Sequence, residues 1–393
     1  MSLSIDREVL HTMQTPFYYY DMSLLKRTID EMLCAASGHP WKIHYAVKAN
    51  GERRILETIS AAGFGADCVS GGEIKAAVEA GFAPGNIFYA GVGKSDDEIR
   101  YALECGIGCF NIESLEELDV VAQIAADMGR VAPVALRINP DIDAHTHEYI
   151  TTGLEENKFG IDRRMLDKAV DAVLACHAVR LRGLHFHIGS QITVHEPFKL
   201  LCERINSMTE RLETKRLHLD FINVGGGIGI DYDNPDSNPV ADFKSFFEVF
   251  NKNLRLRDGQ EIHCEPGRSV VAQCGSLIAR VLYVKEGIQR RFAILDAGMT
   301  DLIRPALYGA RHKIDKLTPH SGDEEMVYDI VGPVCESTDV FAKDEKLPRL
   351  RRNDLVAFRS AGAYGQSMSS CYNMRRLPRA VYSDDVVRLQ ETR

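Results

Sequence analysis

The stretch FGADCVSGGEIKAAVEAGFAPGNIFYAG, residues 64–91, decides the fold of this chain. Its two ends, FGADCV and NIFYAG, are short apolar runs with the length of buried strands. Between them GGEIKAAVEAGF has helical apolar spacing, follows a serine and closes near a glycine, as helix caps require. A strand, a crossover helix and a second strand form a βαβ unit, so the two strands are expected to lie parallel in one sheet.

The same alternation runs from residue 41 to about residue 268. Eight strand-like runs can be counted: IHYAVK, FGADCV, NIFYAG, CFNIES, PVALRIN, RGLHFHI, LDFINVGGG and EIHCEPGR. Helix-like segments such as SDDEIRYALECG and SLEELDVVAQIAADMG lie between them. Eight strand–helix repeats over about 230 residues predict a (β/α)8 TIM barrel. A doubly wound open sheet is the alternative, but it usually has fewer strands and a phosphate-binding turn after the first one.

The chain changes character after the eighth repeat. SVVAQCGSLIARVLYV, RFAILDAG, MVYDIVGPV, DLVAFRSAGAYG and RAVYSDDVVRL are strand-like runs separated by turns. They predict a C-terminal all-β domain. The early segment TPFYYYD is also strand-like and lies outside the eight repeats, so we assign it to the same domain. The expected limits are 22–270 for the barrel and 1–21 plus 271–393 for the β domain.

Composition limits the class of protein and its partners. The 393 residues are 45% hydrophobic, as in a globular chain of two domains. A formal net charge of -9 without a long basic run argues against a nucleic-acid partner. The chain has no run of about 18 apolar residues and no signal-peptide pattern, so we expect a cytoplasmic protein without a membrane partner. Ten cysteines are spread singly, without a CxxC pair, so we expect neither disulfides nor a zinc site.

Reactive side chains follow the predicted barrel strands. A TIM barrel carries its active site at the C-terminal ends of its strands. Those ends carry an amine, carboxyl groups, amides, an imidazole, guanidinium groups and glycines: Lys48, Asp67, Asn111, Glu113, Arg137, Asn139, His187, Gly225, Gly226, Gly227, Glu265 and Arg268. Any one of them could be a solvated loop residue. The set as a whole favours a single functional mouth.

Lys48 and the histidines each allow two interpretations. Lys48 in YAVKAN is either an ion-pair partner or a nucleophile that forms a Schiff base, its pKa lowered by crowding. In HFHIGS, strand geometry puts His185 and His187 on one face. A metal site there lacks a third ligand of matched spacing, so His187 is better interpreted as a stacking ring and His185 as a core residue. His145 and His147 lie in a loop that is either plain surface or a mobile flap.

The glycine run and the eighth strand complete the set of candidate groups. GGGIGI fails the dinucleotide pattern because residue 230 is Ile, and GVGKS fails the P-loop because Phe88 occupies the first glycine position. Glycines after a late barrel strand can still cradle one phosphate, although a plain tight turn is the alternative. Glu265 in EPGR could hold a proton on a ring nitrogen, and Arg268 could bind a carboxylate, or the two could pair with each other. Pyridoxal 5'-phosphate needs four such groups. They are a lysine that reacts with its aldehyde, a flat side chain that stacks on its ring, backbone N–H groups that bind its phosphate, and an acid beside its ring nitrogen.

Many motifs in order closely resemble one family, the fold type III PLP-dependent amino-acid decarboxylases, which include the ornithine, diaminopimelate and arginine decarboxylases. They are TPFYYYD, YAVKAN, FGADCVSGGE, RINPDIDAHTHEYITTG, KFGI, HFHIGSQ, NVGGGIGI, EPGRSVVA, LDAGMTDLIRPALYGARHKI, GPVCESTD and GAYGQSMSSCYN. The resemblance implies a PLP-binding barrel, a Greek-key or β-sandwich-like domain built from both chain ends, and a homodimer with active sites at the subunit interface. Thr300 and the tail RLPRAV depart from the family pattern without touching the chemistry.

The resemblance also implies a role for each candidate residue. Lys48 would carry the cofactor, His187 would stack on its ring with Ser190 nearby, and Glu265 would hold the ring nitrogen. Cys335, from the partner subunit, would be the general acid. The other implied cofactor contacts are Asp67, Gly225, Gly226, Gly227, Pro266, Gly267, Arg268 and Tyr364. The implied substrate contacts are Arg268, Arg304, Tyr308, Glu336 and Tyr364.

Within this family the resemblance implies decarboxylation of meso-2,6-diaminopimelate to L-lysine and CO2, the last step of lysine biosynthesis. Arg304 supports that substrate, because a buried unpaired arginine would disfavour a plain ornithine side chain. Three alternatives stay open: a carboxynorspermidine or other diamine-type decarboxylase, a catalytically silent binding homologue, and an amino-acid racemase. The motif order and GPVCES argue against the racemase, and the presence of Lys48 and Cys335 argues against the silent homologue.

Overall fold

The computed structural model describes residues 12–142, 158–213, 215 and 217–386. Internal contacts divide the chain into two compact units. The barrel unit is Ile29–Gly229 with Asp242–Gly267, and the β unit is Met1–Thr28, Ile230–Ala241 and Arg268–Arg393. Residues 230–241, which the sequence-based limits put in the barrel, therefore group with the β unit. As limits of independently folding domains, 22–270 and 1–21 plus 271–393 stay a prediction.

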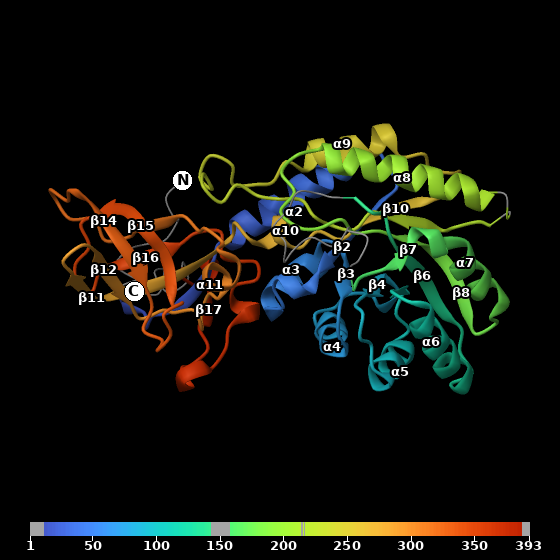
Figure 1. The fold of residues 1–393 in the computed structure, drawn as a ribbon, viewed down its shortest axis with the longest axis horizontal. Helices are drawn as coiled ribbons and strands as arrows, with labels where there is room; N and C mark the ends of the chain where they lie inside the picture. Colours follow the sequence, from blue (N-terminus) through green and yellow to red (C-terminus); the bar gives the residue numbers. More distant parts are fainter. Residues whose placement is uncertain (1–11, 143–157, 214, 216, 387–393) are drawn as a thin grey trace. The chain divides into compact units, whose positions relative to one another are not determined.

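Within the described residues, eight parallel strands close into a barrel (Figure 1). Each strand pairs with the next along the chain, β6 pairs with β8, and β10 pairs back with β2. The strands are β2 (Trp41–Ala46), β3 (Gly65–Cys68), β4 (Ile87–Tyr89), β5 (Cys109–Ile112), β6 (Ala132–Asn139), β8 (Val179–His185), β9 (Phe221–Asn223) and β10 (Glu261–Cys264). They match the eight runs counted in the sequence, so the predicted TIM barrel is confirmed. The short β7 (Ile161–Asp162) adds a pairing to β6.

Helices follow the barrel strands and lie outside the barrel (Figure 1). They are α3 (Arg53–Ala61), α4 (Gly71–Glu79), α5 (Asp96–Cys105), α6 (Leu115–Asp127), α7 (Leu166–Ala175), α8 (Glu196–Glu213) and α9 (Phe243–Asn253), while α2 (Met22–Ala36) contains the unit boundary at Thr28. Serines cap three of them: Ser70, Ser95 and Ser114 each accept a hydrogen bond from the backbone three residues on. These caps satisfy N–H groups that a helix leaves unpaired at its start.

Aromatic side chains fill the barrel and attach its outer helices. Phe88 and Phe221 come from different strands, belong to one buried cluster and have ring centroids 5.3 Å apart. Outside, Trp41 packs edge-on against Phe247 and Phe250 of α9, with centroids at 4.6 and 5.9 Å. Full burial of a Phe side chain stabilises a fold by roughly 1.5–3 kcal/mol. The barrel is therefore a packed core and not a pore, and its polar groups concentrate at the strand ends.

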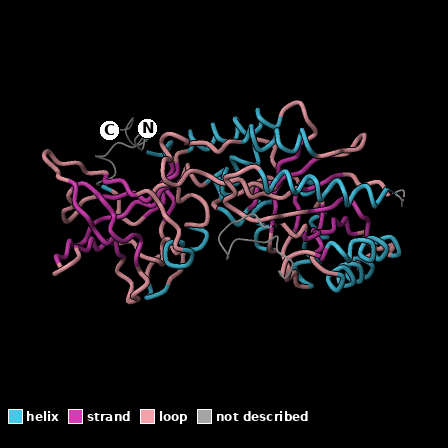
Figure 2. The backbone as a smooth tube through the Cα atoms, turned by 45° about the horizontal axis from the view of Figure 1, so that its top comes forward, coloured by secondary structure: helices cyan, strands magenta, loops and turns pink. Residues whose placement is uncertain are grey.

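The β unit is a sheet with few helices (Figure 2). The strand order is β13-β16-β11-β12-β14-β15, and β1 pairs with both β11 and β17. The elements are β1 (Phe17–Tyr20), α10 (Arg268–Val271), β11 (Gly275–Glu286), β12 (Arg291–Leu295), α11 (Arg304–Tyr308), β13 (Ile314–Lys316), β14 (Glu325–Val331), β15 (Val340–Pro348), β16 (Leu355–Phe358) and β17 (Arg379–Tyr382). The predicted all-β domain is confirmed, as is the assignment of TPFYYYD to its sheet.

Strand β11 joins two halves of this sheet. Its first part pairs with β1 and β16, and its second part, from Val281 onward, pairs with β12 across a register shift between Val281 and Tyr283. A shift of this kind bends a strand and lets it serve two layers, as in β-sandwiches. One prediction is wrong in detail: SVVAQCG is not the start of the strand, because the α-helical bond from the Ala272 N–H to the Arg268 carbonyl replaces strand pairing there.

The described part of the chain also bears on membranes, metals and disulfides. No helix there is long and apolar enough to cross a membrane. No group of three or more His, Cys, Asp or Glu side chains in those residues could hold a metal ion. All ten cysteines lie in described residues and are free thiols.

Candidate active site

Lys48 lies at the C-terminal end of β2, one short turn later than expected. The strand ends at Ala46, and a 3-10 turn, Val47–Ala49, carries the lysine. The backbone that follows β10 fixes this turn. The Ala46 N–H donates to the Pro266 carbonyl at 3.0 Å, and a Cβ on Gly267 would approach Ala46 and Ala49 to 3.0 and 3.1 Å. Only glycine fits at residue 267 without a movement of these neighbours. Pro266 and Gly267, which we expected to contact the cofactor, therefore also fix the backbone that carries Lys48.

The Lys48 ammonium forms an ion pair with Asp67. Nζ lies 3.2 Å from Oδ2, and Asp67 at the end of β3 is 1% exposed whereas the lysine side chain is 40% exposed. Burial and the nearby Glu265 raise the pKa of Asp67 to about 6, against the opposing effect of Lys48. The second oxygen of Asp67 has no hydrogen-bond partner in the described structure. A ligand that binds beside this pair would therefore meet the Lys48 ammonium and the free acceptor Oδ1 of Asp67.

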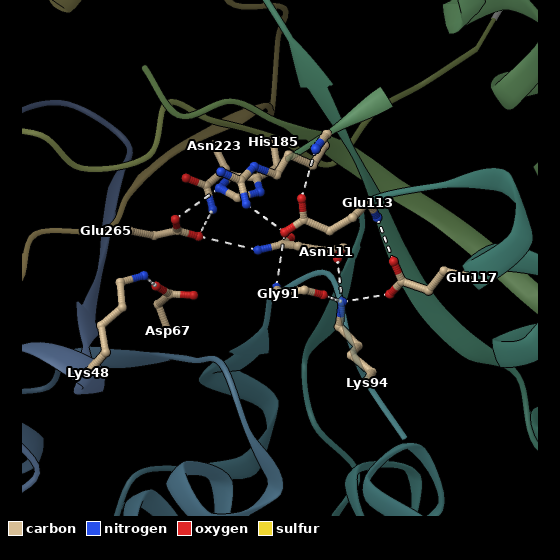
Figure 3. Close-up of polar contacts among 12 residues, drawn as sticks. Lys48, Asp67, Gly91, Lys94, Asn111, Glu113, Glu117, His185, Asn223 and Glu265 are labelled. Carbon is tan, nitrogen blue, oxygen red and sulfur yellow. Dashed lines mark hydrogen bonds and ion pairs between the residues drawn. The ribbon is translucent and has the colours of Figure 1, made fainter. Parts of the chain in front are cut away.

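Glu265 follows β10 and is held by three side chains from other strands (Figure 3). One oxygen accepts from the amides of Asn223 at 2.7 Å and Asn111 at 3.3 Å, and the other lies 2.9 Å from Nε2 of His185. Burial alone would raise the pKa of Glu265, but His185, Lys48 and the other donors hold it below its usual value. The result is a buried carboxylate that stays ionised.

His187 lies in the loop after β8, two residues beyond His185. Its Nδ1 accepts a hydrogen bond from the Gly226 backbone at 3.3 Å, and burial together with Arg137 and Lys48 lowers its pKa well below the ordinary value. A neutral imidazole is therefore present at neutral pH. Such a flat uncharged ring is suited to stacking on a cationic heterocycle.

The three glycines after β9 form a tight backbone cradle. Gly225 and Gly227 have left-handed φ values of 72° and 112°. A Cβ on Gly226 would lie 2.2 Å from the carbonyl oxygen of Glu265, and one on Gly225 would lie 2.3 Å from that of Phe186. No other residue fits here, and the bare backbone can approach an anion closely. Ser190 follows the neighbouring loop and is partly buried.

Glu113 and Arg137 form a structural network at the strand ends. Glu113 accepts from Arg137 Nη1 at 2.5 Å and from the backbone N–H groups of Gly91 and Gly160. Lys94 lies nearby, bonded to Glu117 at 2.6 Å and to the Asn111 carbonyl at 2.9 Å (Figure 3). These charges are satisfied by one another. Their contacts fix the ends of β4 to β6 and so the position of Asn111.

The β unit contains a second group of the expected residues. Arg268 and Arg304 are each 6% exposed. Arg268 donates to the Tyr232 hydroxyl at 2.7 Å and lies 5.0 Å from the Tyr364 ring centroid. Tyr364 has a positive φ of 56°, a strained conformation for a tyrosine that is typical of functional positions. Tyr308 is partly buried at the end of α11, the helix that Arg304 opens.

Cys335 and Glu336 lie on the surface of the β unit. The Cys335 backbone donates to Asn373 Oδ1 at 3.1 Å, and the Tyr372 hydroxyl donates to Glu336 at 2.6 Å. Both Cys335 and Glu336 are exposed, as are Tyr372 and Met374, which flank Asn373 in the sequence, at 51% and 97%. A thiol and an apolar patch are thus presented together on the single chain.

The sequence missed several residues that hold these groups. His185 is buried, as expected of a core residue, but its contact with Glu265 was not predicted. The alternation of HFHIGS could have indicated this contact, because it puts His185 on the same face as His187. Asn223, Tyr232 and His312 carried no local signal, since their contacts come from distant segments. His145 and His147 lie outside the described residues.

Comparison with known proteins gives a consistent result. Residues 24–272 match the model of the pyridoxal binding domain of pyridoxal-dependent decarboxylases. A protein of Bacteroides thetaiotaomicron named diaminopimelate decarboxylase is 53% identical over 96% of this chain and 97% of its own length. The crystal structure of diaminopimelate decarboxylase from Helicobacter pylori, complexed with L-lysine, is 40% identical, with a TM-score of 0.90 over 98% of this chain and 99% of that one.

Proposed function

The chain belongs to the pyridoxal-dependent decarboxylases, and we propose that it converts meso-2,6-diaminopimelate to L-lysine and CO2. The observation that carries the proposal is the 53% identity, over almost the full length of both chains, to a relative of that name. The present chain is thus a PLP-dependent carboxy-lyase, and the proposed reaction makes lysine.

The residues of the barrel mouth fit pyridoxal 5'-phosphate. Among the buried polar atoms without a hydrogen-bond partner in the described structure, three lie on side chains of the barrel mouth: Oδ1 of Asp67, Oδ1 of Asn111 and Nδ1 of His185. The glycine cradle leaves no space for a Cβ atom, so its bare backbone is open to a close approach by an anion. We assign Lys48 to the cofactor's aldehyde, His187 to its ring face and Glu265 to its ring nitrogen. Gly225, Gly226, Gly227 and the backbone of Pro266 to Arg268 are proposed to bind the phosphate, with Ser190, Asp67 and Tyr364 as further contacts.

The side chains of the mouth have defined tasks. When bound, the cofactor supplies an aldehyde for an amine and a ring that takes up the electron pair left as CO2 departs. Because its surroundings keep Glu265 ionised, it would hold a proton on the ring nitrogen and so favour electron uptake. Asp67 holds the Lys48 amine at a fixed place while Gly267 fixes its backbone. The neutral His187 ring would lie against one face of the cofactor ring.

We assign the final proton delivery to Cys335. Loss of CO2 breaks the bond between the α-carbon and the carboxyl carbon, and a proton must then reach that α-carbon. A thiol is a weak acid that can transfer a proton to carbon, which suits this task. We expect Cys335→Ala to keep the cofactor and lose about 10²–10⁴ in kcat. A variant with near wild-type kcat would exclude this assignment.

We propose that the substrate's far end is read by the β unit residues. meso-Diaminopimelate has an ammonium and a carboxylate there, whereas ornithine has an ammonium only. Arg268, Arg304 and Tyr308 are assigned to the carboxylate, Glu336 to the ammonium, and Tyr364 to the same region. Buried guanidinium groups bind carboxylates with strong, directional hydrogen bonds.

We further propose a cytoplasmic homodimer in which Cys335 serves the partner's site. The exposed thiol and the exposed Tyr372 and Met374 beside it support an interface on this surface. The test is to mix inactive Lys48→Ala and Cys335→Ala dimers and let subunits exchange. Random pairing should restore about a quarter of the wild-type sites, because one site in each mixed dimer is intact. No recovery from exchanged, folded dimers would contradict a shared site.

The function is tested by a paired substrate assay. The purified protein, loaded with PLP, should release lysine from meso-diaminopimelate far faster than it decarboxylates ornithine. Borohydride should fix the cofactor to the wild-type chain but not to Lys48→Ala. Preferred turnover of ornithine or another diamine-type substrate would move the chain to the diamine enzymes, and no turnover of any amino acid would favour a silent homologue.

A further inference from the structure

We propose that His312 and Tyr232 are positioning residues that hold Arg304 and Arg268 ready for the distal carboxylate of the substrate. This inference rests on the proposed function. It concerns four residues of the β unit that converge from three separate segments: 230–241, 268 and 304–312. Neither His312 nor Tyr232 is required by the reaction at the cofactor.

His312 is fixed in one tautomer by its two partners. Its Nδ1 lies 2.9 Å from the carbonyl oxygen of Arg359, which can only accept, so Nδ1 carries the proton. Its Nε2 lies 3.0 Å from Nη1 of Arg304, which can only donate, so Nε2 presents a lone pair. The imidazole is 4% exposed. It therefore connects the Arg304 guanidinium to the backbone of a neighbouring strand end.

The electrostatics agree with this arrangement. Burial and the nearby charge of Arg304 lower the pKa of His312 to about 3. A protonated imidazole would lose the lone pair and repel the guanidinium, so the neutral form is the one that positions Arg304. Because the pKa is far below neutrality, the contact persists throughout the ordinary pH range.

Tyr232 connects the two arginines through its ring and its hydroxyl. The hydroxyl accepts from Arg268 at 2.7 Å, while the ring centroid lies 6.0 Å from the Arg268 guanidinium carbon and 5.1 Å from that of Arg304. The His312 ring packs edge-on against it at 5.3 Å. Cation–π contact satisfies part of each guanidinium without neutralising it.

The loop that carries Tyr232 is itself anchored. Asp236 in that loop pairs with Lys313 at 2.9 Å and with Arg359 at 3.1 Å. Arg359 also offers the carbonyl that His312 binds. The loop, His312 and Arg304 are therefore coupled through one set of contacts, and the guanidinium loses less freedom when a ligand arrives.

Arg304 has no ion pair with any carboxylate in the described part of the chain, although it is buried and lies near Arg268. A buried guanidinium supported by an imidazole and a tyrosine ring, as Arg304 is, has no opposite charge beside it among the described residues. It is well suited to an anionic ligand, whose carboxylate would supply that charge. Because His312 and Tyr232 hold the guanidinium without neutralising it, the arrangement can select substrates that carry a carboxylate at this end.

Two matched substitutions separate positioning from packing. In His312→Gln the amide oxygen can occupy the place of Nε2 and still accept from Arg304. In His312→Asn the amide can occupy the place of Nδ1, so it keeps the bond to Arg359 but offers no acceptor to Arg304. We expect His312→Asn to raise KM for meso-diaminopimelate by about tenfold or more with kcat little changed, and His312→Gln to stay near wild type.

Inhibition by cadaverine, a diamine without carboxylates, supplies the control. Its inhibition constant should be unchanged in both variants, because it does not use the arginines. The inference is overturned if His312→Asn leaves KM unchanged, if both variants lose affinity equally, or if cadaverine binding weakens in parallel. Failure of the proposed function would look different: the wild-type enzyme itself would release no lysine.

Discussion

The barrel mouth and the arginine group of the β unit solve the same electrostatic problem with opposite signs. In the mouth, Glu265 is a buried carboxylate held by two amides and an imidazole. In the β unit, Arg304 is a buried guanidinium held by an imidazole lone pair and a tyrosine ring. Each charge has hydrogen-bond or ring partners, yet each remains available to a ligand of the opposite sign.

Specificity and chemistry are divided between these two regions. An anion in the mouth suits a cationic ring nitrogen, which belongs to the cofactor and is needed for any substrate. Cations in the β unit suit a carboxylate that only some substrates carry. Changes in the mouth should therefore affect turnover of every substrate, and changes among the arginines should affect the choice between substrates.

Neutralising the mouth carboxylate should have the largest effect. Glu265→Gln keeps an oxygen for Asn223 but removes the charge, so we expect kcat to fall by about 10²–10³ for every substrate. The folded state holds the pKa of Glu265 below its usual value, so this carboxylate stabilises the fold above its unfolded-state pKa and loses that contribution as pH falls. Thermal melting of the variant should therefore decline less on acidification than that of wild type. Wild-type kcat in the variant would rule out this role for the charge.

Removing the guanidinium of the β unit should have the next largest effect, confined to one class of substrate. Arg304→Met keeps much of the volume and removes the charge. We expect KM for meso-diaminopimelate to rise by about 10²-fold, since a charged hydrogen bond is lost, while cadaverine inhibition stays the same. Steady-state kinetics with both ligands test this. If Arg304→Met weakened the binding of meso-diaminopimelate and of cadaverine equally, the arginine group would not be specific for the carboxylate.

Removing one partner of the carboxylate should have a smaller effect than removing its charge. His185→Phe deletes the contact at 2.9 Å, so the pKa of Glu265 should rise toward its usual value and the acid limb of the kcat/KM profile should move to higher pH. The unfolding free energy should fall by about 1–3 kcal/mol. His185→Gln, which can still donate, is the control. An unshifted pH profile in His185→Phe would mean that Asn111 and Asn223 suffice.

Removing one hydroxyl among the arginines should have the smallest effect. Tyr232→Phe loses the bond to Arg268 but keeps the ring against both guanidinium groups. We expect KM for meso-diaminopimelate to rise by about threefold to tenfold with kcat unchanged. A kcat loss larger than the KM change would mean that Tyr232 acts in the chemistry and not in positioning.

The sequence predicted the barrel well because its signals are local. Each βαβ unit carries its own apolar period and caps, so all eight strands were found in order, and the strand ends then located Lys48, Asp67 and Glu265. The partners of those groups depend on contacts between distant segments. Nothing in residues 230–241 indicates that the loop groups with the β unit, and nothing near His312 indicates Arg359 as its partner. Likewise the apolar run before Gly275 has strand propensity, but its surroundings impose a helical turn.

The pairing of β1 bears on how the chain is synthesised. Phe17 to Tyr20, all buried in the finished molecule, pair with β11 and β17, which leave the ribosome only after the whole barrel sequence. At about 5–20 residues per second, these four aromatic residues wait on the order of ten seconds or longer for their first partner strand. The nascent chain therefore exposes an adhesive segment near its beginning throughout barrel synthesis, which makes it a natural substrate for chaperones that bind aromatic stretches.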